Sequence, residues 1–277
     1  MFDLQPVGQY VLDDPPIAQV LGQVRFPMVA RLQTTEGIAN LQDALSTDYP
    51  YMTKVSETVI GVPTSGPLDL KQEETLSWHF SDDDGRLVVV GPNIVTLSMA
   101  KQYAGFTDFE KRFRSILKTM KEVVRLSRLE RLAIRFLDLV PASETEDENS
   151  SDWFQTEIAG WNRSALITKS TRLQSSMAQL HLVTTPSDEL SLFPAEAQAV
   201  IRFGVVPKGS VVQGIPPVEV GTRSFLLDMD IFVTAPQPYD VEAATEQLRV
   251  LHGQADRFFR WSLTPAGEKH FGLQEKS

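Results

Sequence analysis

One strand motif, in which an arginine stands between apolar residues, occurs three times in the chain. Val/Ile-Arg-Phe is found around Arg25, Arg135 and Arg202, in the stretches QVRFPMV, AIRFLDLVP and VIRFGVVPKG. Because neighbouring side chains of a strand point to opposite faces, each arginine must face away from the apolar residues beside it. The motif therefore predicts strands with a core face and a polar face, on which the arginine heads meet carboxylates.

Alternation of apolar and polar residues predicts a strand-rich first half. Strands are expected at 17–26, 54–62, 74–80, 86–99 and 128–141. The stretch SDDDGR (81–86) predicts a hairpin turn, because Asp and Gly tolerate the backbone angles that such a turn requires. The stretch TTEGIANLQDALS (34–46) fits a short amphipathic helix.

A longer helix is predicted from the spacing of apolar residues after Phe106. Thr107 and Glu110 fit a capping box at its start. The helix is expected to run to about Leu126, with one apolar face that consists of Phe109, Phe113, Ile116, Leu117, Met120, Val123 and Val124.

The second half repeats this arrangement of strands and a helix. A short helix is expected near DWFQTEIAGW (152–161), then strands at 173–184, 196–206 and 223–234. A final helix is expected after Asp240, its N-cap, with the apolar or small residues Val241, Ala244, Leu248, Leu251, Ala255 and Phe258 on one face.

These elements predict an α+β fold of largely antiparallel sheets with long helices packed on them. The acidic stretch between the halves has no large apolar residue and is interpreted as a linker. The predicted organisation is therefore an N-terminal sheet-and-helix half at 1–143, an acidic linker at 144–152 and a C-terminal sheet-and-helix half at 153–277. The shared arginine strands suggest that the two halves are related.

Composition narrows the classes of function. With 277 residues, 42% of them hydrophobic, the chain can bury a sizeable core. A net charge of -10 argues against a surface that is basic throughout, as a general nucleic-acid or membrane platform would be. There is no cysteine, no signal-peptide pattern and no membrane-spanning run, so a soluble cytoplasmic protein that makes no membrane contact is expected.

A row of basic residues is the sharpest functional feature. Its members step by three and four along the predicted long helix and so share one face: Lys111, Arg114, Lys118, Lys121, Arg125 and Arg128. Arg112 and Arg131 flank the row. Such a row suits an acidic protein partner or phosphate groups, and it equally fits a solvated helix face or one neutralised by the acidic linker.

Three strand aspartates, Asp138, Asp228 and Asp230, are weak candidates for metal ligands. Asp228 and Asp230 lie two apart and therefore on the same face of a strand, where they can offer oxygens to a divalent cation. The alternative is that they pair with Arg25, Arg135 or Arg202, an ordinary cross-strand arrangement. His252 and Asp256 are one helical turn apart and fit a local hydrogen-bonded pair. We favour the pairing with arginine, and expect no metal and no cofactor.

Motifs of the common enzyme classes are missing from the sequence. It contains no P-loop, dinucleotide fingerprint, H-E-x-x-H, G-x-S-x-G or protein-kinase set. With four histidines and no cysteine, a carboxylate-only site is the remaining option for catalysis.

Three separated blocks resemble a sporadically distributed, uncharacterised bacterial protein family of similar length. The blocks are DDPPIAQVLGQVRFP, the stretch from GFTDFEKRF to LAIRFLDLVP, and LLDMDIFVTAP with LRVLHGQADRFFRWSLTPAG. Phe136 and Asp138 stand where that family has tyrosine and asparagine, and its second arginine is absent. The resemblance implies no catalytic residues. It implies that the protein is an accessory component encoded in a mobile or defence-linked bacterial operon, for example one for antiviral defence.

Two hypotheses follow from the sequence. The first is a non-enzymatic interaction or regulatory protein whose protein partner is encoded nearby and docks on the basic row or on an exposed sheet edge. The second is a metal-dependent enzyme or binder that acts on a phosphate-containing or nucleic-acid ligand. The first is favoured, and the sequence leaves the oligomeric state open.

Overall fold

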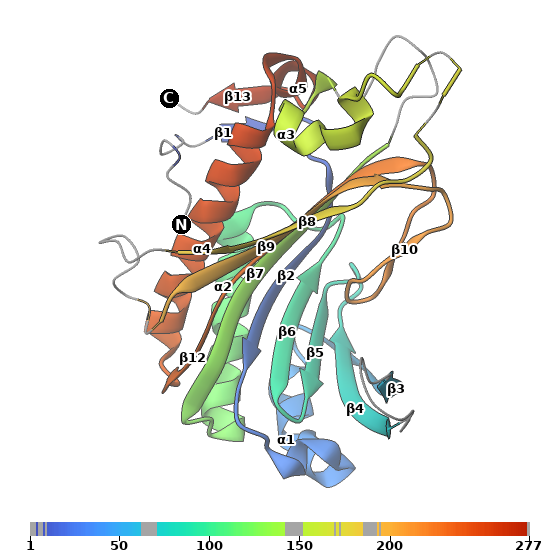
Figure 1. Cartoon of the computed structure of the whole chain (residues 1–277). Helices are drawn as coiled ribbons and strands as arrows, with labels where there is room; N and C mark the ends of the chain where they lie inside the picture. The colour runs from blue at the N-terminus through green and yellow to red at the C-terminus, as the bar shows by residue number, and fades with distance from the viewer. Residues whose placement is uncertain are drawn as a thin grey trace. The chain divides into compact units, whose positions relative to one another are not determined.

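The computed structural model describes residues 4, 8, 10–61, 71–141, 152–168, 170–171, 173–184, 193 and 195–275, with backbone alone for 57–61 and 71–75. Strands and helices of these residues form an α+β fold built on a large antiparallel sheet (Figure 1). The predicted fold class is therefore confirmed.

Nine strands of the described part are hydrogen-bonded in the order β3-β4-β5-β6-β2-β7-β12-β9-β8. Their bounds are β2 Ile17–Arg25, β3 Tyr51–Gly61, β4 Lys71–Ser81, β5 Leu87–Gly91, β6 Ile94–Met99, β7 Arg128–Pro141, β8 Ala178–Val183, β9 Ala197–Val206 and β12 Ser224–Pro238. Two short antiparallel pairs are separate from this sheet: β1 Tyr10–Leu12 with β13 Leu273–Glu275, and β10 Val211–Val212 with β11 Val218–Glu219.

The helices follow the sequence pattern closely. Their bounds are η1 Ala30–Gln33, α1 Thr35–Leu45, α2 Phe106–Thr119, η2 Met120–Val124, α3 Thr156–Ala159, η4 Gly160–Arg163, α4 Val241–Ser262 and α5 Pro265–His270. Thr34 caps α1 by accepting a hydrogen bond from the Gly37 backbone N–H at 3.0 Å. Asp240 caps α4 in the same way, since its Oδ1 accepts from the Ala243 N–H at 2.9 Å.

The chain divides into two compact units, each of which joins segments that are far apart in the sequence. Unit 1 comprises Met1–Leu21, Ala133–Thr234 and Glu246–Ser277, and unit 2 comprises Gly22–Leu132 and Ala235–Thr245. This division differs from the predicted boundary at 144–152, of which only Asp152 is described. The elements β2, β7, β12 and α4 each contribute residues to both units, so contacts rather than sequence order define them. The predicted relation between two halves stays a prediction.

In unit 2, α1 and α2 bury their apolar faces. The residues buried are Ile38, Leu41 and Leu45 of α1 and Phe109, Phe113, Ile116 and Leu117 of α2. Gly22 of β2 lets α2 approach the strand closely, because a Cβ there would lie 2.9 Å from the Phe109 ring.

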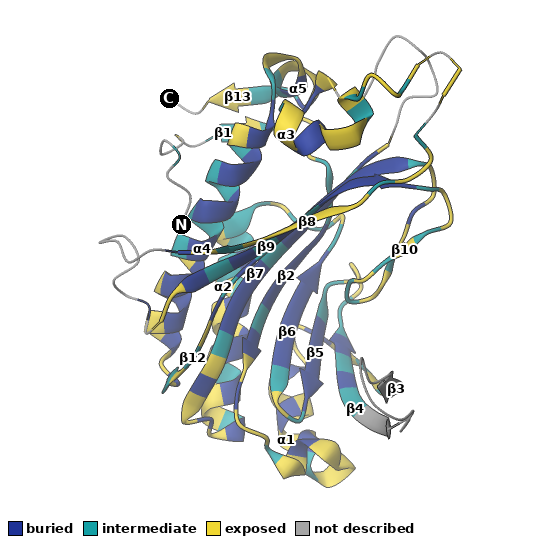
Figure 2. Ribbon diagram, in the orientation of Figure 1, coloured by how far each residue is buried: buried dark blue, intermediate teal, exposed yellow. Residues whose placement is uncertain are grey.

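In unit 1, the apolar face of α4 is buried as the spacing predicted. Leu248, Leu251 and Phe258 are all core residues. A second cluster forms where Leu137, Val206, Val220 and Leu226 pack together. Figure 2 shows buried positions along α4 and along the strands of the sheet.

The three arginine motifs lie on or at the end of strands, as predicted. Arg25 ends β2, Arg135 lies on β7 and Arg202 on β9, and the apolar residues on both sides of each are buried. Arg135 and Arg202 meet a carboxylate. For Arg25 the prediction was wrong: its side chain is exposed, and no described carboxylate pairs with it.

The turn at 81–86 is confirmed, since it joins β4 and β5 in an antiparallel pair. Within it, Asp82 Oδ1 accepts hydrogen bonds from the N–H groups of Asp84 and Arg86 at 3.1 and 2.8 Å. The single strand predicted at 86–99 is in fact two strands, β5 and β6, because the chain reverses at Pro92 and Asn93.

Candidate functional site

Four of the six predicted basic residues share one exposed surface in unit 2. Lys111, Arg114 and Lys118 lie on α2, and Lys121 lies on η2, which continues it. All four are exposed. We call these four residues the basic face.

The other two predicted members leave this surface because the helix ends earlier than the spacing suggested. Arg125 adopts the left-handed conformation with φ 57° and stops the helix, and Arg128 is the first residue of β7. Arg31 donates to the carbonyl oxygens of Val123 and Val124, the last of the helix, and so caps this end. The prediction that Arg125 and Arg128 continue the row along one helix was wrong.

The predicted capping box is also wrong. The N-cap of α2 is Gly105, whose φ of 122° suits glycine, and Thr107 lies inside the first turn. Asp108 supplies the negative charge that favours this end of the helix and bonds Arg112 one turn later, with Nε–Oδ2 at 2.9 Å.

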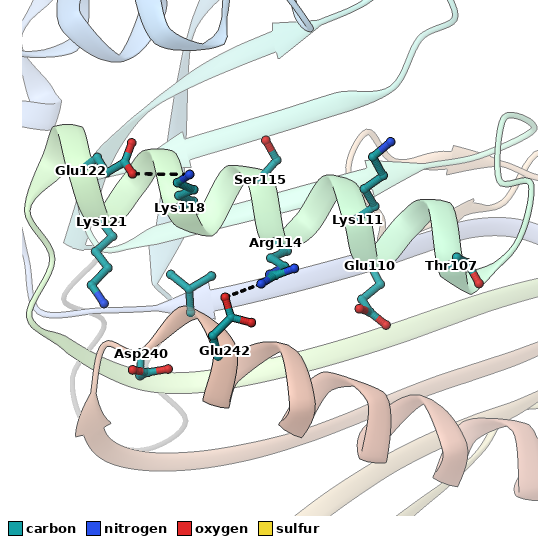
Figure 3. Close-up of a pocket in the computed structure, with 11 residues that line it drawn as sticks. Thr107, Glu110, Lys111, Arg114, Ser115, Lys118, Lys121, Glu122, Asp240 and Glu242 are labelled. Carbon is teal, nitrogen blue, oxygen red and sulfur yellow. Dashed lines mark hydrogen bonds and ion pairs between the residues drawn. The ribbon is translucent and has the colours of Figure 1, made fainter.

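The basic face lines an open groove of about 860 Å³ between α2 and the first turn of α4, both in unit 2 (Figure 3). Tyr239 holds the two segments together: its hydroxyl donates to the Leu117 carbonyl at 3.2 Å, and its N–H donates to the Ser127 carbonyl at 3.0 Å. The described residues of the wall besides the basic face are Thr107, Glu110, Ser115, Glu122, Asp240, Val241 and Glu242.

The charges in the groove are partly paired. Arg114 Nη2 lies 2.5 Å from Glu242 Oε1, and Lys118 Nζ lies 3.9 Å from Glu122 Oε1. Lys111 and Lys121 have no such partner among the described residues, and Figure 3 shows Lys121 extending toward the start of α4 and Lys111 pointing the other way. Arg114 and Lys118 of the basic face therefore already have an acidic partner within the chain. The linker residues 144–151, proposed to neutralise them, lie outside the described residues.

Asp228, a metal candidate, is engaged by two arginines in unit 1. Arg135 binds it with both ends of its guanidinium, Nε to Oδ1 at 2.6 Å and Nη2 to Oδ2 at 2.9 Å. Arg202, directly opposite on β9, reaches Oδ2 from Nη1 at 3.1 Å. A carboxylate held by two cations is a poor metal ligand, so this geometry favours the cross-strand pairing.

Asp138 lies on the other face of β7. Arg135 reaches Asp228, and Asp138 is three residues further along the strand, so alternation directs it to the opposite face. Its side chain is buried, and Oδ1 has no hydrogen-bond partner among the described residues. Burial raises the pKa of Asp138 to about 8, helped by the charge of Asp228. The carboxyl is therefore largely protonated at neutral pH.

The predicted pair of His252 and Asp256 is present on α4, with Nδ1 and Oδ2 3.5 Å apart. Burial lowers the pKa of His252 to about 4, and the ring packs against Phe136. Burial also raises the pKa of Asp256 to about 6, against a smaller lowering by a hydrogen bond from Tyr10. His252 is thus neutral at pH 7, and its contact with Asp256 is not an ion pair there.

Metal-ligating side chains do not gather in the part of the chain that the structure describes. No three His, Asp or Glu residues converge there. Asp138 and Asp228 point to opposite faces of the sheet, so the three candidate aspartates do not form one site.

Sequence reasoning missed Glu242 and Asp240 as groove residues. They lie more than a hundred positions after the basic face, and the only signal for them was the predicted start of a helix. It also missed Gln213, whose carbonyl accepts from Arg135 Nη2 at 2.8 Å.

Comparison with known proteins identifies no relative of this chain. No family model, curated protein or solved structure matches the chain significantly. In the described residues, every helix is too short or too polar to cross a bilayer. The resemblance to a bacterial family stays a prediction.

Proposed function

We propose that this protein is a non-enzymatic interaction protein that binds an acidic segment of a protein partner along the groove of the basic face. The observation that carries the proposal is the exposure of four cations beside an open groove, two of them without a described partner. In a chain of net charge -10, these four cations form a local cluster of the opposite sign, and four carboxylates line the same groove.

The ion pairs already present do not block such a partner. Arg114 and Lys118 and their acidic partners are solvent-exposed, and exposed pairs contribute roughly 0 to 1 kcal/mol each. An incoming carboxylate can therefore replace Glu242 or Glu122 at low cost.

The same wall disfavours a nucleic acid. Four carboxylates, those of Glu110, Glu122, Asp240 and Glu242, line the groove beside the four cations. A nucleic-acid backbone is negatively charged throughout and would meet these carboxylates, whereas a protein segment can place its acids and its neutral residues separately. The resemblance noted in the sequence favours a partner that is encoded nearby, in a mobile or defence-linked operon.

The test uses the two lysines without a described partner. The double variant Lys111→Glu, Lys121→Glu changes the net charge by the same amount as a control, Lys101→Glu, Lys208→Glu, at exposed lysines outside the groove. Binding is measured by fluorescence anisotropy with a labelled glutamate-rich peptide and a single-stranded oligonucleotide of equal charge. Proteins that co-purify from the native host are identified by mass spectrometry and retested with both variants.

We expect the groove variant to lose the peptide and the control to keep it. Added salt should weaken the wild-type complex, because exposed charges are screened over about 8 Å at physiological ionic strength. Equal binding by the two variants would refute the proposal. Tighter binding of the oligonucleotide than of the peptide would favour a nucleic-acid ligand instead.

A further inference from the structure

Among the described residues, strand β8 ends the sheet in unit 1 and has one edge without a neighbouring strand. It is the last strand in the order of the described residues and pairs only with β9, in the register Ala178↔Phe203 to Val183↔Gln198. Five of its six residues are exposed and the sixth is half-buried, and Figure 2 shows β8 as exposed over most of its length. No strand of the described residues therefore occupies the outer edge.

The backbone groups at this edge can be assigned from the register. Thr184 N–H donates to the Ala197 carbonyl at 2.9 Å, so the even-numbered residues direct their backbone groups to β9. Gln179, His181 and Val183 then direct their N–H and C=O groups outward. No backbone hydrogen bond joins these three to another described residue beyond the sheet.

The side chains of β8 extend an apolar face to the edge. Leu180 and Leu182 stand opposite Ile201 and Ala199, which are fully buried. Leu180 is nevertheless 40% exposed, and Val183, on the opposite face of the strand, is 51% exposed. The edge thus offers apolar surface and unpaired backbone together.

Edge strands of natural proteins are usually protected from pairing by a lysine, a proline or a bulge. The sequence of β8, AQLHLV, contains no charged residue and no proline, and its register with β9 is uninterrupted. The chain as a whole carries a net charge of -10, so the acidic surfaces of two copies repel each other. This uncharged strand is a segment at which two copies can approach without opposing charges.

We propose that β8 pairs antiparallel with β8 of a second copy, across a two-fold axis at His181, and so joins two sheets. Because only odd-numbered residues point their backbone outward, this axis places His181 opposite His181 of the second copy and Gln179 opposite Val183 of the second copy. Leu180 then stands opposite Leu182 of the second copy, and the apolar face continues across the junction. A second copy fits this edge because the pattern is complementary to itself, as a two-fold interface requires. This proposal does not rest on the groove.

The test uses charge at the axis. His181→Lys places two lysines opposite each other, and His181→Glu places two glutamates. Both substitutions keep the backbone bonds to β9, because the backbone of residue 181 points away from that strand, and both remove the side-chain hydrogen bond between His181 Nε2 and Gln198 Oε1. Met28→Lys is the control, since it adds the same charge at an exposed apolar residue far from β8 in the sequence. Mass is measured by sedimentation over a concentration series, with circular dichroism to check folding.

We expect the wild type and Met28→Lys to dimerise alike and each His181 variant to weaken association about fivefold or more, as like charges facing across a strand pair do. An equimolar mixture of His181→Lys and His181→Glu should recover the dimer, because opposite charges then meet at the axis. In hydrogen exchange, the amides of Gln179, His181 and Val183 should become protected as the wild-type concentration rises. A wild type that stays monomeric, or a mixture no tighter than the single variants, overturns the proposal and leaves the edge to a strand of another protein.

Discussion

Replacing Asp138 by asparagine should stabilise the protein at neutral and alkaline pH. The side chain of Asp138 is only 2% exposed, and its Oδ1 has no hydrogen-bond partner among the described residues. The ionised form has no local compensation there, so the folded protein holds the carboxyl in its neutral form. Asparagine keeps the size of the side chain and is neutral at every pH.

The magnitude follows from the shift in pKa. Burial, with a contribution from Asp228, raises the pKa of Asp138 from 3.8 to about 8. Between these pH values Asp138 keeps its proton in the folded protein and releases it in the unfolded chain. The contribution of Asp138 to the unfolding free energy is therefore highest below about pH 4 and falls as the pH rises toward 8. The slope is ~1.4 kcal/mol per pH unit, and the loss at pH 8 and above is on the order of 5 kcal/mol.

The assay compares urea unfolding of the wild type and Asp138→Asn at pH values from 5 to 9. We expect the difference in unfolding free energy to grow with pH in favour of the variant and to level off above pH 8. His252 and Asp256 also have shifted pKa values, but they titrate in both proteins and cancel in the difference. Leu251→Ala is the control, because it removes a buried apolar group and should give a difference that is independent of pH.

A difference between wild type and Asp138→Asn that stays constant from pH 5 to 8 would refute this reasoning. It would mean that Asp138 is ionised in the folded protein and that its charge is compensated. A carboxyl titration followed by NMR gives an independent reading, with an expected midpoint near the pKa of about 8.

Two further predictions concern stability. Leu251→Ala should lower the unfolding free energy by about 2 to 5 kcal/mol in urea titrations, because Leu251 is fully buried on α4. Arg249→Ala, on the exposed side of the same helix, should lower it by less than about 0.5 kcal/mol. Equal effects of the two substitutions would show that the face of Leu251 is not part of the core. Asp228→Asn should cost about 3 to 5 kcal/mol at pH 7, because it removes the carboxylate that binds Arg135, whose side chain is only 17% exposed. Arg202→Gln should cost less, because the Arg202 side chain is 37% exposed, and the reverse order would contradict the proposed roles.

Local sequence pattern was sufficient for most strands and helices. A strand places successive side chains on alternate faces and a helix repeats every three to four residues, so burial on one side leaves a readable period. That is why β7 was predicted with its observed bounds, and the preference of aspartate for helix starts correctly predicted Asp240 as the cap of α4. The same alternation correctly set Asp228 on a polar face.

Only the tertiary structure decided which distant residues meet. The period of the basic row continues past Val124, but a left-handed Arg125 ends the helix, and Arg31 from elsewhere in unit 2 caps it. Glu242 reaches Arg114 from 128 positions away, a contact that no local period can encode. Asp138 and Asp228 look alike in sequence, yet Oδ1 of Asp138 is buried with no partner among the described residues, while Asp228 is held by two arginines. Pairing and solvation depend on the neighbours that folding assembles, and these, rather than residue type, set the charge each aspartate carries.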